Sequence, residues 1–287
     1  MRDLAKFAMK GPRQAAIIAL LSTLVPMMFW LGAAVVGLVT LRQGFSKGFA
    51  VFIWAIVPAL AWWLGLQDPT ALIVLVLTLF MAEFLRSSIS LRNTLLFGFA
   101  LSVLVGAITP FLMPEVIDML MTLTEQMFRE MAEQAEVPFD DSLKESFRVL
   151  IVASFAASFY FMSLGALFLA RSWQAALYNP GGWREEFHQL RLNPASVAGL
   201  FAVVFLAPSL GVGASLVALC ATVPVIVCGL ALVHGLIGKK NLGGQWVFGF
   251  YALVIVLFPT VLMLVALWAI VDSVVDFRSK VQSQAAP

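Results

Sequence analysis

The charged residues of this chain are distributed so that long stretches of sequence contain none. The 34 Asp, Glu, Lys and Arg residues leave seven such stretches, at 14–41, 48–67, 69–82, 93–114, 149–170, 192–238 and 241–271. A helix needs roughly 20 apolar residues, at about 1.5 Å each, to cross a hydrocarbon core about 30 Å thick. Most stretches reach that length and one could cross twice. The sequence therefore predicts an all-α, polytopic transmembrane helical bundle.

Composition agrees with a single integral membrane domain covering 1–287. Charged residues make up 12% of the chain, and the mean hydropathy is +0.96. A soluble domain contains about 25% charged residues. No basic stripe is interleaved with aromatic residues, which argues against nucleic acid as a partner. The lipid bilayer is the partner that this composition predicts.

Basic residues gather in alternate loops, and positive loops of membrane proteins prefer the cytoplasm. The N-terminal tail and the loops near Arg42, Arg86 and Lys239 are basic, whereas the loop at Asp68 and the segment 114–147 are acidic. The sequence therefore predicts a multi-pass protein with a cytoplasmic N-terminus.

The alternation fails only at the first uncharged stretch, 14–41. Basic residues stand at both of its ends, so both ends are expected on the cytoplasmic side. Pro26 lies near its middle, and Gly32 follows. A broken or re-entrant pair of short helices, 15–25 and 27–41, would satisfy the charges if its turn were buried in protein or lined a cavity. A single tilted helix, with the next loop outside, is the alternative.

The remaining stretches predict further crossings near 49–66, 70–85, 93–112, 149–170, 195–210, 214–237 and 246–271. Together with the first stretch they give about eight membrane segments, within a range of roughly seven to nine. By this count the C-terminus lies on the opposite side of the membrane from the N-terminus, although the charges near it, at 272–280, cancel and do not decide its side.

The segment 114–147 predicts an extramembrane, acidic, amphipathic helix. It contains nine of the 16 acidic residues, and its apolar residues recur at three- and four-residue spacing. Such a helix could pack on the protein's own surface or lie in the membrane interface. Alternatively, Met119, Met127 and Met131 could form a flexible docking face for a partner.

A second extramembrane segment, 178–194, contains the turn signal Asn-Pro-Gly-Gly. In the residues that follow, Trp183 and Phe187 fall on one helical face. This pattern predicts a short interfacial helix at the cytoplasmic surface, although the same face could contact a cytoplasmic partner.

Ionisable residues inside or beside the apolar stretches are few, and such residues often mark function in membrane proteins. Glu83 lies three residues before Arg86, so the two can pair on one helix face. Asp272 and Asp276 are like charges one turn apart near a helix C-terminus, where the dipole already disfavours anions. Arg278 is the local candidate to offset them, in either a structural clamp or a functional contact.

Arg42 and His234, each close to a basic loop, are further candidate ligand-binding or structural polar residues. No series of carboxylates for a proton relay, no Ser-His-Asp or His-Glu-x-x-His pattern and no Cys/His cluster occurs in the sequence. We therefore expect no enzyme activity, no metal site and no cofactor. The sequence also lacks a Gly-x-x-x-x-Gly-Lys-Ser/Thr loop, so any ATP would have to be used by a partner.

Small residues at four-residue spacing allow helices to approach closely, and Ala15 with Ala19 is one such pair. Internal packing is the simplest explanation, because such pairs are common in a sequence rich in Ala and Gly.

Three stretches together resemble one protein family. They read LVTLRQGFSKG at 38–48, GLALVHG at 229–235 with Lys239 and Lys240, and DSVVDFR at 272–278; NPGG at 179–182 followed by EEF at 185–187 adds to the likeness. These patterns resemble the YybS-like bacterial membrane proteins, an uncharacterised family. That family is considered similar to the substrate-binding S components of energy-coupling-factor (ECF) vitamin transporters.

The resemblance implies a protein of the bacterial cytoplasmic (inner) membrane, with a core of six short helices that hold a small-molecule pocket near the outer side. It also implies docking to a transmembrane coupling component driven by two ATPases. S components use an Ala-x-x-x-Ala pattern on their first helix for that docking, and Ala15 with Ala19 matches it. The extra crossings and the 114–147 excursion depart from the family's pattern.

Two functional hypotheses follow. The first is an S-component-like small-molecule binding or uptake subunit without its own ATPase, in which polar groups such as Ser102, Thr109 and Tyr160 set specificity among the bundle helices. The second is a membrane scaffold or assembly protein that docks partners through the 114–147 helix and the 178–194 segment.

Overall fold

The computed structural model describes residues 2–211 and 213–281, and within these ranges the chain forms helices and no strands. Six of the helices described are long and apolar enough to cross a membrane, or seven if a bent pair at 182–210 forms one span. The predicted all-α polytopic bundle is confirmed, and the chain is a multi-pass membrane protein.

The N-terminal part of the bundle is built around one short buried helix. The helices in order are α1 (Arg2–Ala8), α2 (Pro12–Leu24), α3 (Phe29–Gln43), α4 (Phe45–Leu66), α5 (Thr70–Ser88) and α6 (Leu91–Leu112). Every residue of α3 from Gly32 to Leu41 is buried. This helix is apolar on all sides, and α2, α4, α5 and α8 (Leu143–Tyr178) pack around it.

The stretch 14–41 forms two short antiparallel helices, as the broken-pair interpretation predicts. At about 1.5 Å per residue, α2 and α3 are each roughly 20 Å long, less than a hydrocarbon core. They pack closely, because a Cβ added to Gly32 would lie 2.9 Å from the carbonyl oxygen of Ala19. The indole of Trp62 donates a hydrogen bond to the Thr23 carbonyl at 3.1 Å, which fixes the end of α2 against α4.

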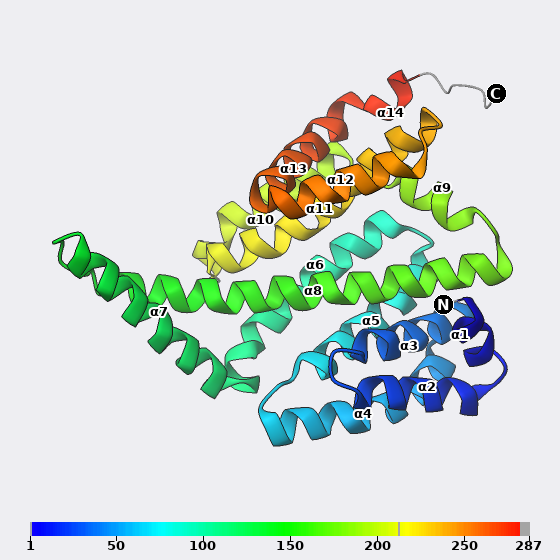
Figure 1. Cartoon of the computed structure of the whole chain (residues 1–287), viewed down its shortest axis with the longest axis horizontal. Coiled ribbons are helices and arrows are strands. Elements are labelled where there is room, and N and C mark those ends of the chain that lie inside the picture. The colour runs from blue at the N-terminus through cyan, green and yellow to red at the C-terminus, as the bar shows by residue number, and fades with distance from the viewer. Residues whose placement is uncertain (1, 212, 282–287) are drawn as a thin grey trace.

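The C-terminal half begins with an excursion and ends with a second hairpin. α7 (Pro114–Gln134) projects from one end of the bundle, and the 36-residue α8 returns along its whole length (Figure 1). The remaining elements are α9 (Gly182–Gln189), α10 (Pro194–Leu206), the 3-10 turn η1 (Ala207–Leu210), α11 (Ala214–Lys239), α12 (Gly244–Val256), α13 (Phe258–Val275) and α14 (Phe277–Lys280). The two predicted extramembrane segments therefore contain the helices α7 and α9.

The expectation of one crossing at 246–271 is wrong, because the chain breaks at Leu257 and forms the two helices α12 and α13. Pro259 lies in the first turn of α13, where its missing N–H costs nothing. α12 runs back along α11, placing the Tyr251 hydroxyl 3.1 Å from the His234 ring. α13 then returns, so the described C-terminal residues lie at the same end of the bundle as α1 (Figure 1). The opposite placement, expected from the count of crossings, is corrected.

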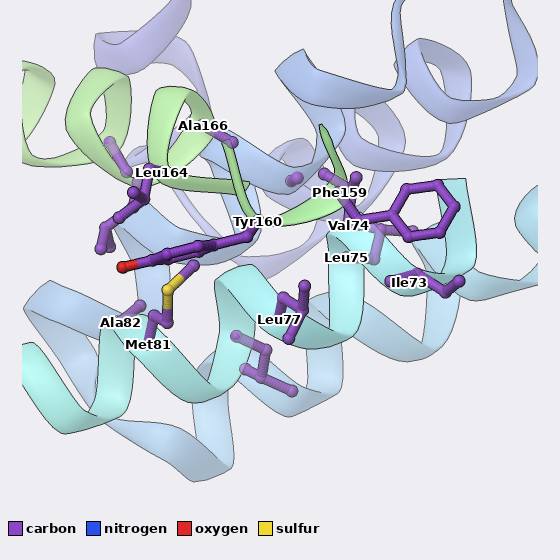
Figure 2. Close-up of a cluster of buried hydrophobic side chains, with 14 of the residues drawn as sticks. Ile73, Val74, Leu75, Leu77, Met81, Ala82, Phe159, Tyr160, Leu164 and Ala166 are labelled. Atoms are coloured by element: carbon purple, nitrogen blue, oxygen red, sulfur yellow. The ribbon is translucent and has the colours of Figure 1, made fainter. Parts of the chain in front are cut away.

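A cluster of buried hydrophobic side chains lies between α5 and α8. Figure 2 shows the ring of Tyr160 lying against Met81, with Leu77 and Leu164 nearby. Tyr160 and Met81 are fully buried. Gly98 on α6 makes this contact possible, because an added Cβ would lie 2.5 Å from the Tyr160 ring.

The outer surface of the bundle is apolar. Large side chains that are at least half exposed occur on most of the long helices, including Trp54, Val57, Phe111, Phe161, Phe248 and Met263. A surface of this kind would be a large exposed patch in water but is the normal covering of helices in lipid. These helices therefore contact the bilayer.

Candidate functional site

The two ends of the bundle have opposite charge. We call the end that holds α1, the α3–α4 and α5–α6 turns, α9 and α14 the basic end, and the end that holds α7 the acidic end (Figure 1). Fifteen of the 18 Lys and Arg residues and six of the 16 Asp and Glu residues belong to the basic end. The other three basic and ten acidic residues belong to the acidic end. This asymmetry has the pattern by which membrane proteins are oriented.

A buried ion pair lies at the basic end. The Arg278 guanidinium contacts the Asp272 carboxylate at 2.6 Å, and their side chains are 9% and 2% exposed. Arg278 also donates hydrogen bonds to the carbonyl oxygens of His188 and Leu190, at 2.8 and 2.9 Å. The second Asp272 oxygen accepts a hydrogen bond from the Phe277 N–H at 2.9 Å. The pair therefore satisfies most of its polar atoms and joins α14 to the end of α9 and to Leu190, which follows it.

Two further contacts surround this pair. Arg191 binds the Asp276 carboxylate at 3.0 Å. The Lys239 ammonium donates to the carbonyl oxygens of Arg278 and Val281. Arg278 thus offsets the charge of Asp272, as the sequence indicated it could. We call Asp272, Arg278, Arg191, Asp276 and Lys239 the C-terminal clamp.

Aromatic rings attach α9 to the bundle beside the clamp. Trp183 and Phe187 stack with their centroids 5.3 Å apart, and both contact Phe168 of α8. The Phe187 ring also meets the His234 ring edge-on at 5.6 Å. Trp183 and Phe187, predicted as a docking face, are thus partly covered by the chain's own helices. The structure brings together His234, Phe187 and the clamp, which lie far apart in the sequence.

A groove of about 480 Å³ runs alongside α9, α11 and α14 at this end. Arg184, His188, Lys239 and Arg278 line it together with the small residues Gly235 and Gly238. Burial lowers the pKa of His188, and the neighbouring positive charge of Arg184 lowers it further. His188 is therefore biased towards its neutral form.

The predicted pair of Glu83 and Arg86 is absent from the ion pairs of the described residues, which corrects that expectation. The Arg86 guanidinium instead lies against Gly44 in the α3–α4 turn, where the glycine has a φ of +93° and no side chain in the way. One Glu83 oxygen is buried and has no hydrogen-bond partner within the described parts of the chain. Arg42 lies over the Tyr178 ring at 4.3 Å, in a cation–π contact between the ends of α3 and α8.

The three polar residues proposed to set ligand specificity are buried and already hydrogen-bonded. Ser102 and Thr109 each donate to a carbonyl oxygen of their own helix at 2.7 Å. The Tyr160 hydroxyl donates to the Leu95 carbonyl of α6 at 2.5 Å. These hydroxyls satisfy backbone oxygens, so each helps to hold the packed interior.

Ala15 and Ala19 are buried within the chain, at 1% and 0% exposure. Their helix packs against α3 and α4, and the Ala19 carbonyl oxygen lies against Gly32 of α3. Their placement agrees with internal packing, and this face of α2 is covered by the protein itself.

The acidic end carries the other candidate surface, which we call the arm: α7, residues 135–142 and the first turns of α8. Met119, Met127 and Met131 are 56%, 52% and 56% exposed on α7. Arg129 bridges Glu125 and Asp141 at 2.8 and 2.9 Å, and Lys144 bridges the same two carboxylates. These contacts close the turn between α7 and α8.

A second groove, of about 380 Å³, lies between α7 and α8. Its lining combines aromatic rings with hydroxyl groups: Thr124, Phe128, Phe147, Ser154, Phe155 and Ser158. Phe128 and Phe147 stack across the two helices, with centroids 4.6 Å apart. This groove was not predicted from the sequence. The apolar spacing of the 114–147 segment did predict a helix with one apolar face, which could pack on the protein's own surface.

No protein-family model, curated protein or solved structure matches this chain. The YybS-like resemblance therefore stays a prediction from its motifs. Across residues 2–211 and 213–281, no group of three or more His, Cys, Asp or Glu side chains is placed to hold a metal ion.

Proposed function

We propose that the protein is a non-enzymatic, S-component-like subunit that binds a small molecule in the groove between α7 and α8. The observation that carries this proposal is the groove itself, which combines stacked aromatic rings with hydroxyl groups. Its volume of about 380 Å³ falls in the range of roughly 300 to 1,000 Å³ that is typical of small-molecule sites.

The lining defines the class of ligand. Phe128, Phe147 and Phe155 offer apolar faces, while Thr124 and Ser158 offer hydroxyls that can donate or accept. None of these groups is charged. The ligand we propose is an uncharged or weakly polar molecule with one flat apolar portion and a few hydrogen-bonding groups.

The charge asymmetry supports an orientation for this site. With basic loops in the cytoplasm, the arm lies on the outer side of a bacterial inner membrane, and the N-terminus is cytoplasmic. A compound arriving from outside would then meet the groove first. Uptake would require a coupling partner with ATPases, because the chain has no phosphate-binding loop of its own.

The test is ligand-dependent stabilisation of the full chain in lipid nanodiscs against a broad set of metabolites. We expect at least one compound to raise the melting temperature. Phe128→Ala should weaken its binding by about tenfold, because a ring contact worth roughly one kcal/mol and its buried area are lost. Phe111→Ala, at an 83% exposed phenylalanine near the same end, is the matched control. The proposal fails if no compound stabilises the protein, or if both variants reduce binding equally.

A scaffold role is the alternative, and the exposed methionines of α7 favour it. Met side chains are flexible and suit surfaces that dock varied apolar partners. Replacing Met119, Met127 and Met131 by Ser leaves the groove lining unchanged but makes the exposed face polar. Loss of a co-purifying protein in this variant, with ligand stabilisation intact, would favour the scaffold. Loss of ligand stabilisation in Phe128→Ala, with the co-purifying protein retained, would favour the binding subunit.

A further inference from the structure

The groove at the basic end differs from the α7–α8 groove in the charge of its lining. Arg184, Lys239 and Arg278 contribute three positive charges, and Glu185 is the single carboxylate among the residues that line it. The Arg278 charge is neutralised by Asp272 at 2.6 Å. The charges that remain available to a ligand are therefore those of Arg184 and Lys239.

These two cations have no carboxylate partner among the described residues. Lys239 contacts only the carbonyl oxygens of Arg278 and Val281 there, which hold its position without cancelling its charge. The carboxylates nearby are occupied, because Glu186 binds Arg171 at 2.8 Å and Asp276 binds Arg191 at 3.0 Å. Glu185 is exposed and forms no ion pair within the described chain.

Two glycines of α11 shape the floor of this groove. A Cβ added to Gly235 would lie 2.7 Å from the His188 carbonyl oxygen, so the glycine allows α9 to lie directly on α11. At Gly238, an added Cβ would lie 2.7 Å from the His188 ring and 3.6 Å from a nitrogen of the Arg184 guanidinium. The side chains of Arg184 and His188 thus extend over α11, next to Lys239.

Two Trp side chains indicate that this groove lies at the level of the lipid headgroups. Trp183 of α9 and Trp246, 57% exposed at the start of α12, flank this end. Trp side chains are enriched at the level of lipid headgroups, and basic pockets between helices at that level bind anionic headgroups. A guanidinium and an ammonium side by side suit a phosphate group, because the first donates two parallel hydrogen bonds and the second acts as a point charge.

We propose that this groove binds the phosphate group of an anionic ligand, held by Arg184 and Lys239 with His188 alongside. Two sources share this chemistry: the phosphodiester of an anionic phospholipid, and a free phosphate compound. The proposal is independent of the function proposed for the α7–α8 groove, because it involves neither the same residues nor the same end of the bundle.

The experiment measures binding by the full chain and by Arg184→Gln, whose side chain forms no ion pair with a described residue. Native mass spectrometry counts the lipid molecules that the protein retains and compares phosphatidylglycerol with phosphatidylcholine. In a parallel measurement, thermal unfolding of lipid-depleted protein in neutral detergent is followed with added inorganic phosphate. Arg92→Gln removes the same charge at the basic end but outside the groove, and is the matched control.

We expect Arg184→Gln to weaken binding by about tenfold or more, because the charge-assisted hydrogen bonds of the guanidinium are lost, while Arg92→Gln changes little. Lys239→Gln should weaken it comparably. Preference for phosphatidylglycerol without an effect of inorganic phosphate would assign the lipid as the source. Stabilisation by inorganic phosphate would assign a free phosphate compound. The proposal is overturned if neither anion binds preferentially, or if Arg184→Gln and Arg92→Gln behave alike.

Discussion

The C-terminal clamp and the arm both use Arg–carboxylate contacts shorter than 3 Å, yet they differ in how much water reaches them. In the clamp, Arg278 and Asp272 are 9% and 2% exposed at a distance of 2.6 Å. In the arm, Arg129 and Asp141 are 43% and 70% exposed at 2.9 Å. The two distances are similar, but the clamp pair is buried and the arm pair is exposed to water.

The comparison teaches that burial, more than distance, decides what an ion pair contributes. Exposed pairs gain little net stability, because water and salt screen the charges and the long side chains lose freedom. A buried pair is also of modest net value, but removing one partner leaves a charge without solvent or a counter-ion. The clamp should therefore be sensitive to single substitutions, and the arm should tolerate them.

The largest effect is expected for Arg278→Met. The substitution leaves the Asp272 carboxylate buried without its partner, which should cost about 3–5 kcal/mol. Lys280→Met, at an exposed position of the same helix, is the control. The measurement is chemical unfolding of the full chain in nanodiscs. The double variant Asp272→Asn/Arg278→Met should recover part of the loss. A loss no larger than that of Lys280→Met would show that the clamp does not hold the fold.

The next largest effect is expected for Gly235→Ala, which tests the packing beside the clamp. The added Cβ would lie 2.7 Å from the His188 carbonyl oxygen, so α9 must move away from α11. We expect a loss of about 1–3 kcal/mol, the usual cost of overpacking. Gly249→Ala on α12 is the matched control, because its added Cβ meets no atom within 4 Å. Equal unfolding free energies for the two variants would contradict the close α9–α11 contact.

Lowering the pH should destabilise the turn between α7 and α8 in the arm before it affects the buried part of the bundle. The hydrogen bond from Lys144, followed by that from Arg129, lowers the pKa of Glu125 below its ordinary value of 4.5. Lys144 likewise lowers the pKa of Asp141 below 3.8. A carboxylate whose pKa is lowered in the folded arm stabilises the arm at any pH above its ordinary pKa. That stabilisation is lost as the pH falls through the lowered pKa. Hydrogen exchange at 135–142 should therefore rise in this acidic window, while exchange in α3 stays slow. A rise near neutral pH instead would exclude these carboxylates as the cause.

The sequence predicted the long helices well, because charges mark their ends. The expected crossings 49–66, 70–85 and 93–112 correspond to α4, α5 and α6 with small differences at the ends. The break in 14–41 was also predicted, since the basic residues on both sides and Pro26 favoured a broken pair over a single tilted helix. The break at Leu257 was missed because no charge flags it, although Pro259 is the same kind of signal as Pro26.

The candidate sites were less predictable, because they depend on contacts between distant helices. The spacing of Asp272, Asp276 and Arg278 suggested a local clamp, and the close pair of Asp272 and Arg278 lies within one short segment. Nothing in the sequence pairs Arg278 with the His188 carbonyl, 90 residues earlier. The pairing of Glu83 with Arg86 looked equally local but fails, because the open space above Gly44 receives the Arg86 side chain.

The smallest effect is expected for Arg129→Gln, which tests how little the exposed ion pairs of the arm contribute compared with the buried pair of the clamp. It removes the contacts at 2.8 and 2.9 Å to Glu125 and Asp141, but Lys144 still bridges both carboxylates at 3.0 and 3.1 Å. Unfolding of the bundle should be unchanged, and protease cleavage within 135–142 should rise only about two- to fivefold, the usual scale of an exposed pair. Added salt should reduce the difference between wild type and variant, because exposed charges are screened. A loss of bundle stability comparable to that of Arg278→Met would mean that the arm is an integral part of the core, and the contrast between the two ends would no longer hold.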